Sequence, residues 1–424
     1  MALTTPTTNQ ALRPVAAAER VFGWHNHAAL WFSLGVGLLV LQMGALIAPA
    51  LGLAGALWVT GAGSLLGAAL LGWVAYIGCA SGLASAGLMH AAMGGRFARL
   101  PVLLNIVQLL GWGAFELVVM REATVAIVQR LGWAGASAAL PAVATLAWGG
   151  LLAALMLLPM VQTVRRLIAR VALPLVALAL LWLTWQLLGT AGAQGWGVLW
   201  ARPGDGSMGP LAALDLVVAM PVSWLPLVAD YARHGRGARG AFWGTWAGFA
   251  LANAWCYGLG VLVALLMPGT EMMAAVLLVQ GGLLTLALIL LDEVDNAYGD
   301  VYSAALGAHS LRPRQPPGRW AVGIALACTA MALVLPMHGL EPFLILLSSV
   351  FTPLFGVIVG RLAGRRDAAA LLARAPPVQW TCVGIWLLGI ATYHAAAQWA
   401  PQWGAALPAF GLTLLLAGLT RRVG

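Results

Sequence analysis

Two side chains one helical turn apart are well suited to bind a flat ring. Trp112 and Glu116 lie in the apolar segment 101–128. Four residues apart, they share one face of a helix, and both fall near the middle of that segment. An indole can stack on a planar heterocycle while a carboxylate accepts hydrogen bonds from its ring N–H groups. This pattern predicts a binding site for a small flat nitrogen heterocycle.

The segment from residue 292 to residue 303 carries the densest group of acidic and polar residues. One polar stripe, at helical spacing and bordered by Asp295, consists of Asp292, Asn296, Gly299 and Ser303. A charged side chain in mid-membrane costs at least ~2.5–3.5 kcal/mol, so such residues usually face the protein interior. Their oxygen atoms could coordinate Na⁺, or a carboxyl group shielded from water could carry a proton. In an alternative interpretation, the helix ends near Leu291 and the acids lie in a solvated loop.

The elements that hold these residues are membrane-spanning helices. Of the 424 residues, 62% are hydrophobic and 8% are charged, whereas soluble domains carry about 25% charged residues. Since a spanning helix needs roughly 20 apolar residues, we predict an all-α integral membrane protein with twelve transmembrane helices. The predicted spans are 28–49, 52–77, 101–128, 138–160, 167–190, 211–229, 240–267, 272–298, 319–336, 341–362, 379–397 and 404–420.

The arginines alternate between successive loops. They cluster before span 1, in the loops after spans 2, 4, 6, 8 and 10, and after span 12, whereas the other loops hold only Arg130 and Arg202. Because short arginine-bearing loops stay in the cytoplasm during insertion, both termini are predicted to be cytoplasmic. The expected location is the bacterial inner membrane.

Spans 1 and 6 are the candidates for interrupted helices. Span 1 contains Gly35, Gly37 and Pro49, and span 6 contains Pro221 and Pro226. Proline removes a backbone donor and clashes with the preceding turn, and freed backbone groups at this depth must face protein or a wet cavity. Spans five apart are equivalent if a five-span unit is repeated upside down, as in many secondary transporters.

The remaining composition excludes several classes of protein. The cysteines Cys79, Cys256, Cys328 and Cys382 lie in apolar segments at no metal-binding spacing. No metalloprotease or serine-hydrolase motif occurs, and a chain without lysine cannot form a P-loop. We therefore predict neither an enzyme nor an ATP-driven pump; a membrane enzyme using the span 8 acids would lack a nucleophile or metal ligands.

No soluble basic domain accompanies the net charge of +9, so nucleic acid is not an expected partner. The predicted partners are a small heterocyclic substrate and the lipid bilayer, with the chain acting as a monomer. No cofactor is expected beyond Na⁺ or H⁺ as a coupling ion. The pair Arg121 and Glu122, nearer the outer interface, is expected to be structural.

Four segments resemble the nucleobase:cation symporter-1 family of purine-cytosine permeases. They are 31–52 (WFSLGVG…APALG), 105–116 (NIVQLLGWGAFE), 219–233 (AMPVSWLPLVADYAR) and 300–307 (DVYSAALG). Among its branches, the chain looks most like the CytX-type hydroxymethylpyrimidine permeases. The resemblance implies the LeuT-type fold, a five-plus-five inverted repeat followed by two C-terminal helices, and cation-coupled uptake of a flat heterocycle.

The resemblance also implies roles for particular residues. In this family, a span 3 tryptophan stacks on the substrate ring and a polar residue one turn later binds it, and these positions match Trp112 and Glu116. The other predicted substrate-binding residues are Trp224, Asn296 and Gln42. The coupling ion is expected between the bend of span 1 and span 8, at Gly37, Asp292, Glu293 and Asp295.

The chain departs from the family at these positions. Glu116 stands where glutamine is frequent, and acids stand at 292, 293 and 295 where many relatives have Ser, Thr or Asn. Both departures favour H⁺ over Na⁺, or contact with a protonatable aminopyrimidine, whose ring N–H and exocyclic amine suit an ionised Glu116. The predicted function is import of a pyrimidine such as hydroxymethylpyrimidine; the alternative is a cytosine/purine or allantoin/hydantoin permease.

The predicted organisation follows from the same spans. Residues 1–24 form a disordered cytoplasmic tail, 25–190 the first repeat, 205–366 the second repeat and 375–420 the last two spans.

Overall fold

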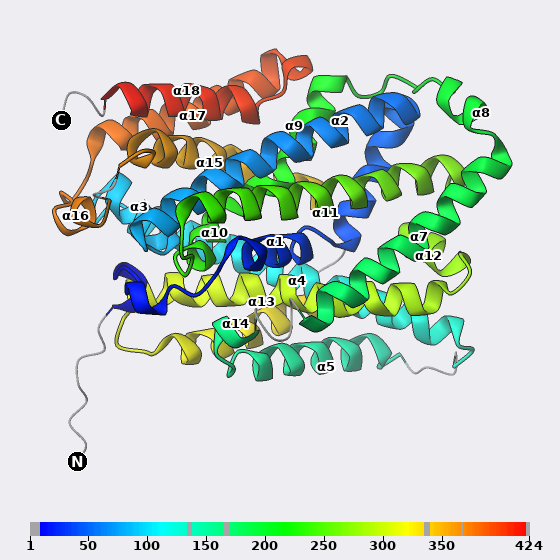
Figure 1. Cartoon of the computed structure of the whole chain (residues 1–424), viewed down its shortest axis with the longest axis horizontal. Helices are drawn as coiled ribbons and strands as arrows, with labels where there is room; N and C mark the ends of the chain where they lie inside the picture. Colours follow the sequence, from blue (N-terminus) through cyan, green and yellow to red (C-terminus); the bar gives the residue numbers. More distant parts are fainter. Residues whose placement is uncertain (1–8, 134–137, 164–169, 335–339, 366–367, 421–424) are drawn as a thin grey trace.

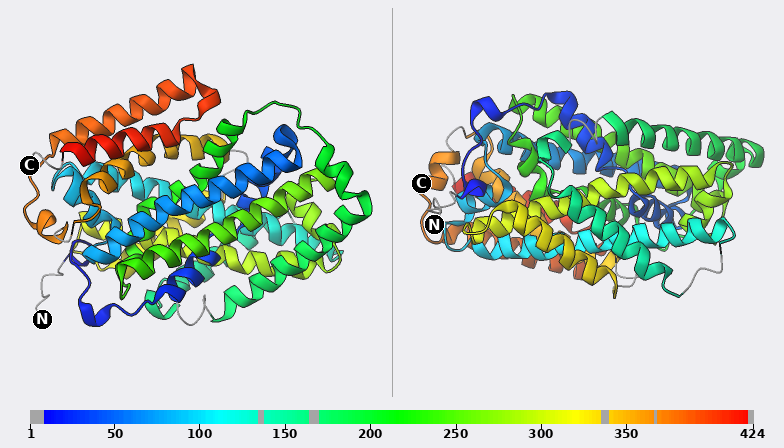
Figure 2. Two further views of the ribbon diagram at one scale, coloured as in Figure 1. Left: turned by 45° about the horizontal axis from the view of Figure 1, so that its top comes forward. Right: turned by 90° about the horizontal axis from the view of Figure 1, so that it is seen from below.

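The computed structural model describes residues 9–133, 138–163, 170–334, 340–365 and 368–420, which form helices and no β-sheet (Figure 1). The long helices run side by side, with α17 and α18 at one edge of the molecule and α5 and α14 at the other (Figures 1 and 2). The helices are α1 (Trp24–Ser33), α2 (Leu38–Ser81), α3 (Ser85–Met93), α4 (Arg99–Arg130), α5 (Leu140–Leu155), α6 (Met160–Gln162), α7 (Leu173–Gln194), α8 (Trp196–Ala201), α9 (Pro210–Ser223), α10 (Leu225–Ala232), α11 (Ala238–Leu266), α12 (Met272–Leu278), α13 (Gly282–Leu311), α14 (Pro317–Ala332), α15 (Leu340–Leu362), α16 (Ala368–Ala373), α17 (Trp380–Trp399) and α18 (Ala406–Thr420), with 3-10 turns η1 (Gln10–Leu12), η2 (Ala17–Glu19) and η5 (Pro401–Trp403).

The outer surface of the bundle is apolar. Large side chains such as Trp58 and Trp185 are 75% and 73% exposed, a surface suited to lipid rather than water. Seven described helices are long and apolar enough to cross a membrane, namely Leu38–Ser81, Arg99–Arg130, Arg170–Gln194, Pro210–Ala232, Ala238–Leu266, Ile345–Leu362 and Trp380–Trp399. The prediction of an all-α integral membrane protein is confirmed.

The first predicted span is broken, as its glycines indicate. α1 ends at Ser33 and α2 begins at Leu38, so residues 34–37 join them without continuing the helix. Gly35 permits the close approach of α11, because a Cβ there would lie 2.9 Å from that of Ala252. The carbonyl freed at Val36 accepts a hydrogen bond from a neighbouring helix, which satisfies it at membrane depth.

The sixth predicted span is also broken. α9 ends at Ser223, α10 begins at Leu225, and Trp224 lies between them. Pro226 falls in the first turn of α10, where its missing N–H needs no intrahelical partner and its fixed φ suits a helix start. The interruption predicted from Pro221 and Pro226 is therefore confirmed.

α2 contains both the end of span 1 and the whole of span 2. An unbroken helix of its 44 residues would be about 66 Å long, about twice the thickness of a membrane core. Gly52 divides it, with φ of 67° in the left-handed region that glycine tolerates. A Cβ on Gly52 would also lie 2.7 Å from the carbonyl oxygen of Arg202.

The boundaries predicted for span 8 were wrong at both ends. The run 272–298 is divided between α12 and α13, and α13 continues to Leu311. α12 ends at Leu278, and Gly281, with φ of 73°, lies in the break immediately before α13. At the other end the acids 292, 293 and 295 are buried inside α13, so the loop interpretation with a helix end near Leu291 is excluded.

A free tail was expected for residues 1–24; residues 1–8 lie outside the described residues, but residues 9–23 lie across one end of the bundle. This N-terminal strap forms hydrogen bonds with three helix ends: Asn9 Nδ2 donates to the Ser310 carbonyl of α13, the Val15 N–H to the Gly82 carbonyl after α2, and the Phe22 N–H to the His234 carbonyl between α10 and α11. Carbonyl groups at helix ends lack intrahelical donors, so the strap satisfies groups that would otherwise need water. The last residues of α18 lie at the same end of the molecule (Figure 1).

Glycines let α2 and α11 pack backbone to backbone. A Cβ on Gly44 would clash with the Tyr257 carbonyl of α11, and a Cβ on Gly260 would clash with the Leu41 carbonyl of α2. Small residues serve this purpose in membrane bundles, where close packing replaces the hydrophobic effect between helices.

We expect Gly260→Ala to destabilise the protein by about 1–3 kcal/mol, because the added methyl group overpacks this contact. Thermal unfolding of the purified protein in detergent measures the effect. The matched control is Gly258→Ala on the same helix, where the nearest atom to an added Cβ is a Leu57 methyl group 3.7 Å away. Equal unfolding temperatures for the two variants would contradict the prediction.

Candidate functional site

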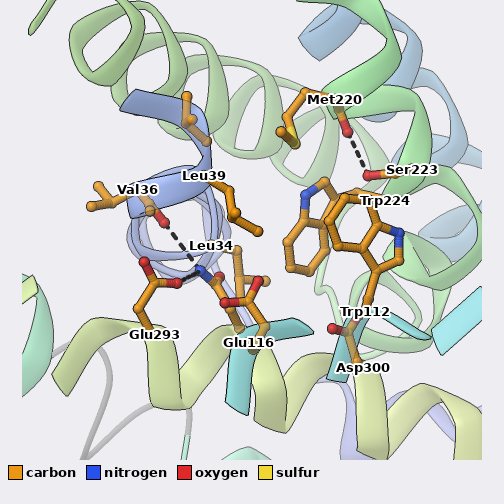
Figure 3. A pocket seen from close by; sticks show the side chains of 13 residues that line it. Leu34, Val36, Leu39, Trp112, Glu116, Met220, Ser223, Trp224, Glu293 and Asp300 are labelled. Atoms are coloured by element: carbon orange, nitrogen blue, oxygen red, sulfur yellow. Dashed lines mark hydrogen bonds between the residues drawn. The ribbon is translucent and has the colours of Figure 1, made fainter. Parts of the chain in front are cut away.

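A cavity lies where the two broken spans meet α4 and α13 (Figure 3). Its volume is about 20 Å³, room for about one water molecule, so a heterocycle needs some of these side chains to move. The lining residues are Leu34, Val36, Gly37, Leu39, Val40, Trp112, Glu116, Met220, Ser223, Trp224, Glu293, Asn296 and Asp300. Six of the nine predicted site residues are thus brought together, namely Gly37, Trp112, Glu116, Trp224, Glu293 and Asn296.

α4 contributes Trp112 and Glu116 from one face. The two residues are 6% and 4% exposed. Close packing of α4 holds them, since a Cβ on Gly113 would lie 3.0 Å from the sulfur of Cys328 and 3.8 Å from Cβ of Asp300. Glu116 Oε2 is buried with no hydrogen-bond partner among the described residues. An unpaired buried carboxylate oxygen is costly, so this atom is suited to accept a hydrogen bond from a ligand.

Trp224 reaches the cavity from the break between α9 and α10. Its carbonyl accepts hydrogen bonds from the N–H groups of Leu227 and Val228, which starts α10. Its indole ring packs edge-on against Trp31, with centroids 6.0 Å apart and planes at 87°. Figure 3 shows the indoles of Trp112 and Trp224 on one side of the cavity and the carboxyl groups of Glu116 and Glu293 on the other.

α13 holds the break of span 1 through two side chains. Asn296 Nδ2 donates to the Val36 carbonyl at 3.1 Å and to Glu293 Oε2 at 3.2 Å. Glu293 Oε1 accepts from the N–H of Leu38 at 2.6 Å. Leu38 is the first residue of α2, so a carboxylate lies at the positive end of that helix, which stabilises it. A movement of α13 would therefore act directly on the broken helix.

Asp292 and Asp295 lie on α13 outside the cavity lining. Asp292 Oδ1 accepts a 2.8 Å hydrogen bond from Ser33 Oγ, at the end of α1. Asp292 Oδ2 and both carboxylate oxygens of Asp295 have no hydrogen-bond partner among the described residues, although the residues are 1% and 6% exposed. Buried carboxylate oxygens without donors suit a cation or a proton.

Gln42 lies apart from the other predicted substrate-binding residues. It lines two surface cavities of about 990 and 450 Å³ towards the end of the molecule opposite the N-terminal strap. The larger one also contacts Arg121 and Glu122, which form a 2.7 Å salt bridge, while Arg121 donates to the Ala332 carbonyl. These contacts support the structural role expected for that pair.

Asp300 lines the cavity but was missing from the predicted site. It lies one turn after Asn296 on α13, at the four-residue spacing that placed Trp112 and Glu116 on one face. Extending that spacing along span 8 would have identified it. Ser223 and Met220 also line the cavity; only the fold could indicate them, because their chemical types are common throughout the chain.

The described residues contain no group of three or more His, Cys, Asp or Glu side chains that could hold a metal ion. The four cysteines are buried and unbridged. An alkali cation needs no such group, since backbone carbonyl and hydroxyl oxygens can also coordinate it.

A helical membrane protein with two spans broken around a buried central cavity has the architecture of the LeuT-type secondary transporters. Solved structures agree. Over 98% of this chain and 94% of the other, the fold matches Mhp1, a nucleobase-cation-symport-1 family transporter, closed with bromovinylhydantoin bound (TM-score 0.82, 17% identity). It also matches inward-facing Mhp1 (99% and 94% covered, TM-score 0.78, 17% identity) and a Na⁺-coupled sialic acid symporter (99% and 93%, TM-score 0.62, 11% identity).

The family follows from the sequence itself. Residues 14–415 match the model of the permeases for cytosine/purines, uracil, thiamine and allantoin, and the chain belongs to this family. It is therefore a membrane transporter and not an enzyme. A comparison with curated proteins found no match.

Proposed function

We propose that this permease imports a small flat nitrogen heterocycle by cation symport, and that its substrate is a pyrimidine such as hydroxymethylpyrimidine, the thiamine precursor. Trp112 and Trp224 stack on the ring, while Glu116 and Asn296 accept or donate hydrogen bonds at its edge. The observation that carries this proposal is the convergence of two indoles and an unpartnered Glu116 oxygen on one buried cavity between two broken helices.

Two separate cavities in this structure support an alternating-access mechanism. The larger outer cavity, at 990 Å³, reaches Gln42, while Leu39 and Val40, three and two residues before it, line the central cavity. Gln42 therefore contacts substrate on the way in rather than in the bound state.

The coupling ion is proposed to bind between the end of α1 and α13. Gly37 and Glu293 border the break, while Asp292 and Asp295 supply carboxylate oxygens beside Ser33. Na⁺ would be coordinated by these oxygens and by backbone carbonyls; H⁺ would be carried by a carboxyl group. The buried oxygens without hydrogen-bond partners support either ion.

The orientation proposal rests on charge. The junctions between α3 and α4, α10 and α11, and α13 and α14 lie beside the strap. They carry Arg96, Arg99, Arg233, Arg236, Arg239, Arg312, Arg314 and Arg319, and arginine-bearing loops stay in the cytoplasm. The termini are therefore proposed to be cytoplasmic and the location to be the bacterial inner membrane. The arginines at 165, 166, 366, 421 and 422 lie outside the described residues.

We also propose that the chain acts as a monomer. Its first repeat comprises residues 25–190, its second repeat residues 205–366 and its last two spans residues 375–420.

The proposed function predicts selective binding before any transport assay. The purified protein is screened by thermal shift against hydroxymethylpyrimidine, cytosine, uracil, adenine, allantoin and hydantoin, each with Na⁺ and with choline. We expect the aminopyrimidines to raise the unfolding temperature most. Uptake of the best ligand into proteoliposomes, with an imposed Na⁺ or pH gradient, then identifies the coupling ion.

The same screen decides between the proposed substrate and its alternative. The family description includes cytosine, purines and allantoin, so stabilisation by a purine or by allantoin or hydantoin alone would replace hydroxymethylpyrimidine with that class. Absence of stabilisation by every ring, together with no uptake, would contradict the proposed function as a whole.

A further inference from the structure

The described side chains that line the central cavity include acidic groups but no basic ones. Glu116, Glu293 and Asp300 line it, and their exposed fractions are 4%, 1% and 3%. Among the described residues that line it there is no Arg, Lys or His. The nearest arginine along α4 is Arg121, whose guanidinium is already paired with Glu122 and the Ala332 carbonyl. Three carboxyl groups therefore share one buried space without a protein cation.

The cavity also contains buried hydrogen-bond acceptors that lack donors. Glu293 receives two N–H donors, from Leu38 and Asn296. Glu116 Oε2 and Asn296 Oδ1 are buried acceptors with no partner among the described residues. A ligand that brings N–H donors would satisfy these two acceptors.

The charge of a heterocycle determines whether it can both compensate the carboxyl groups and supply the missing N–H donors. Protonation of a 4-aminopyrimidine spreads a positive charge over the ring N–H and the exocyclic amine, and each can donate to a different carboxylate. Such charge-assisted hydrogen bonds are stronger than neutral ones, and a cation offsets the cost of burying like charges together. Uracil and hydantoin also carry ring N–H donors, but they are neutral and carbonyl oxygens flank the N–H groups; carboxylates repel these oxygens, a basis for rejection.

We propose that the cavity selects its substrate as a cation, a protonated amino-heterocycle held between Glu116 on α4 and Asp300 on α13, with Asp300 determining this charge selectivity. The inference rests on the proposed function of the same site and adds the charge state of the substrate to it. Separate helices supply the two carboxyl groups, so the bound cation bridges α4 and α13.

Other titratable groups surround the cavity and could themselves make binding depend on pH. They are Asp292, Glu293 and Asp295 on α13, Tyr231 on α10, whose hydroxyl lies 3.6 Å from the Cβ position of Gly299, Cys328 on α14 and Cys256 on α11. Their contribution is the same for every ligand. A ligand series that differs only in basicity separates their titration from that of the ligand.

The test measures binding to the full-length protein in detergent by calorimetry, at fixed Na⁺ and several pH values. The probes are 4-aminopyrimidine, a more basic ring-methylated derivative, a less basic ring-fluorinated derivative and the neutral isostere 4-pyrimidinone. We expect the affinity of each amine to fall about tenfold per pH unit above that ligand's own pKa, so that the midpoint moves with the ligand. The isostere should bind at least tenfold more weakly.

A common midpoint for all three amines, or equal binding of the isostere, would overturn the inference while leaving the proposed function intact. Loss of all ring binding would overturn both.

Asp300→Asn provides the second measurement. We expect it to reduce affinity for 4-aminopyrimidine at low pH at least tenfold while 4-pyrimidinone loses less than threefold. Asp205→Asn, at an exposed residue of the loop before α9, is the matched control and should match the unsubstituted protein. If Asp300→Asn unfolds, the ligand series alone decides; equal losses for both ligands in a folded variant would contradict the role of Asp300.

Discussion

Trp112→Ala is expected to reduce substrate affinity by roughly 5- to 150-fold, because stacking of a heterocyclic base on an aromatic ring contributes about 1–3 kcal/mol. Trp112 lies in the cavity wall at 6% exposure, so its removal also leaves space in which the ring can tilt. The measurement is the initial rate of uptake at subsaturating substrate, normalised to the amount of folded transporter.

Two controls accompany this variant. Trp112→Phe keeps an aromatic face and should recover most of the loss. Trp185→Ala removes a tryptophan that is 73% exposed on α7 and should transport normally. Uptake by a folded Trp112→Ala protein at the unsubstituted rate would show that the ring binds elsewhere.

Asp295→Asn is expected to abolish accumulation against a gradient while substrate binding and exchange persist. Asp295 lines no part of the central cavity, yet both of its carboxylate oxygens are buried without hydrogen-bond partners among the described residues. An amide cannot bind and release a proton, and it binds a cation far more weakly than a carboxylate does. The internal substrate concentration should therefore only equal the external one.

The measurement compares net uptake with counterflow in proteoliposomes, under Na⁺ and pH gradients applied separately. Asp295→Glu retains the carboxyl group and should restore part of the accumulation. Asp292→Asn serves as a comparison on the same helix, because an asparagine oxygen at this position can still accept the Ser33 hydrogen bond. Unchanged accumulation by Asp295→Asn would assign coupling to another group.

Several features of this transporter were predictable from the sequence because they depend on local chemistry. Apolar runs of spanning length predicted the helices, and the prolines of span 6 and glycines of span 1 predicted the two breaks. The shared helix face of Trp112 and Glu116 followed from their spacing alone. Each of these features depends on residues within one helical turn or one span, so the local sequence was enough to predict it.

The sequence by itself therefore determined the membrane class, the broken spans and the pairing of indole with carboxylate on α4. Only the tertiary structure decided which residues of other helices meet them: it brought Asp300 and Glu293 into the cavity, put Gln42 outside it, and divided the run 272–298 at Gly281. The physical reason is that hydropathy measures transfer into a nonpolar medium but not the direction a side chain faces. A buried acid on α13 is tolerated because neighbouring helices surround it.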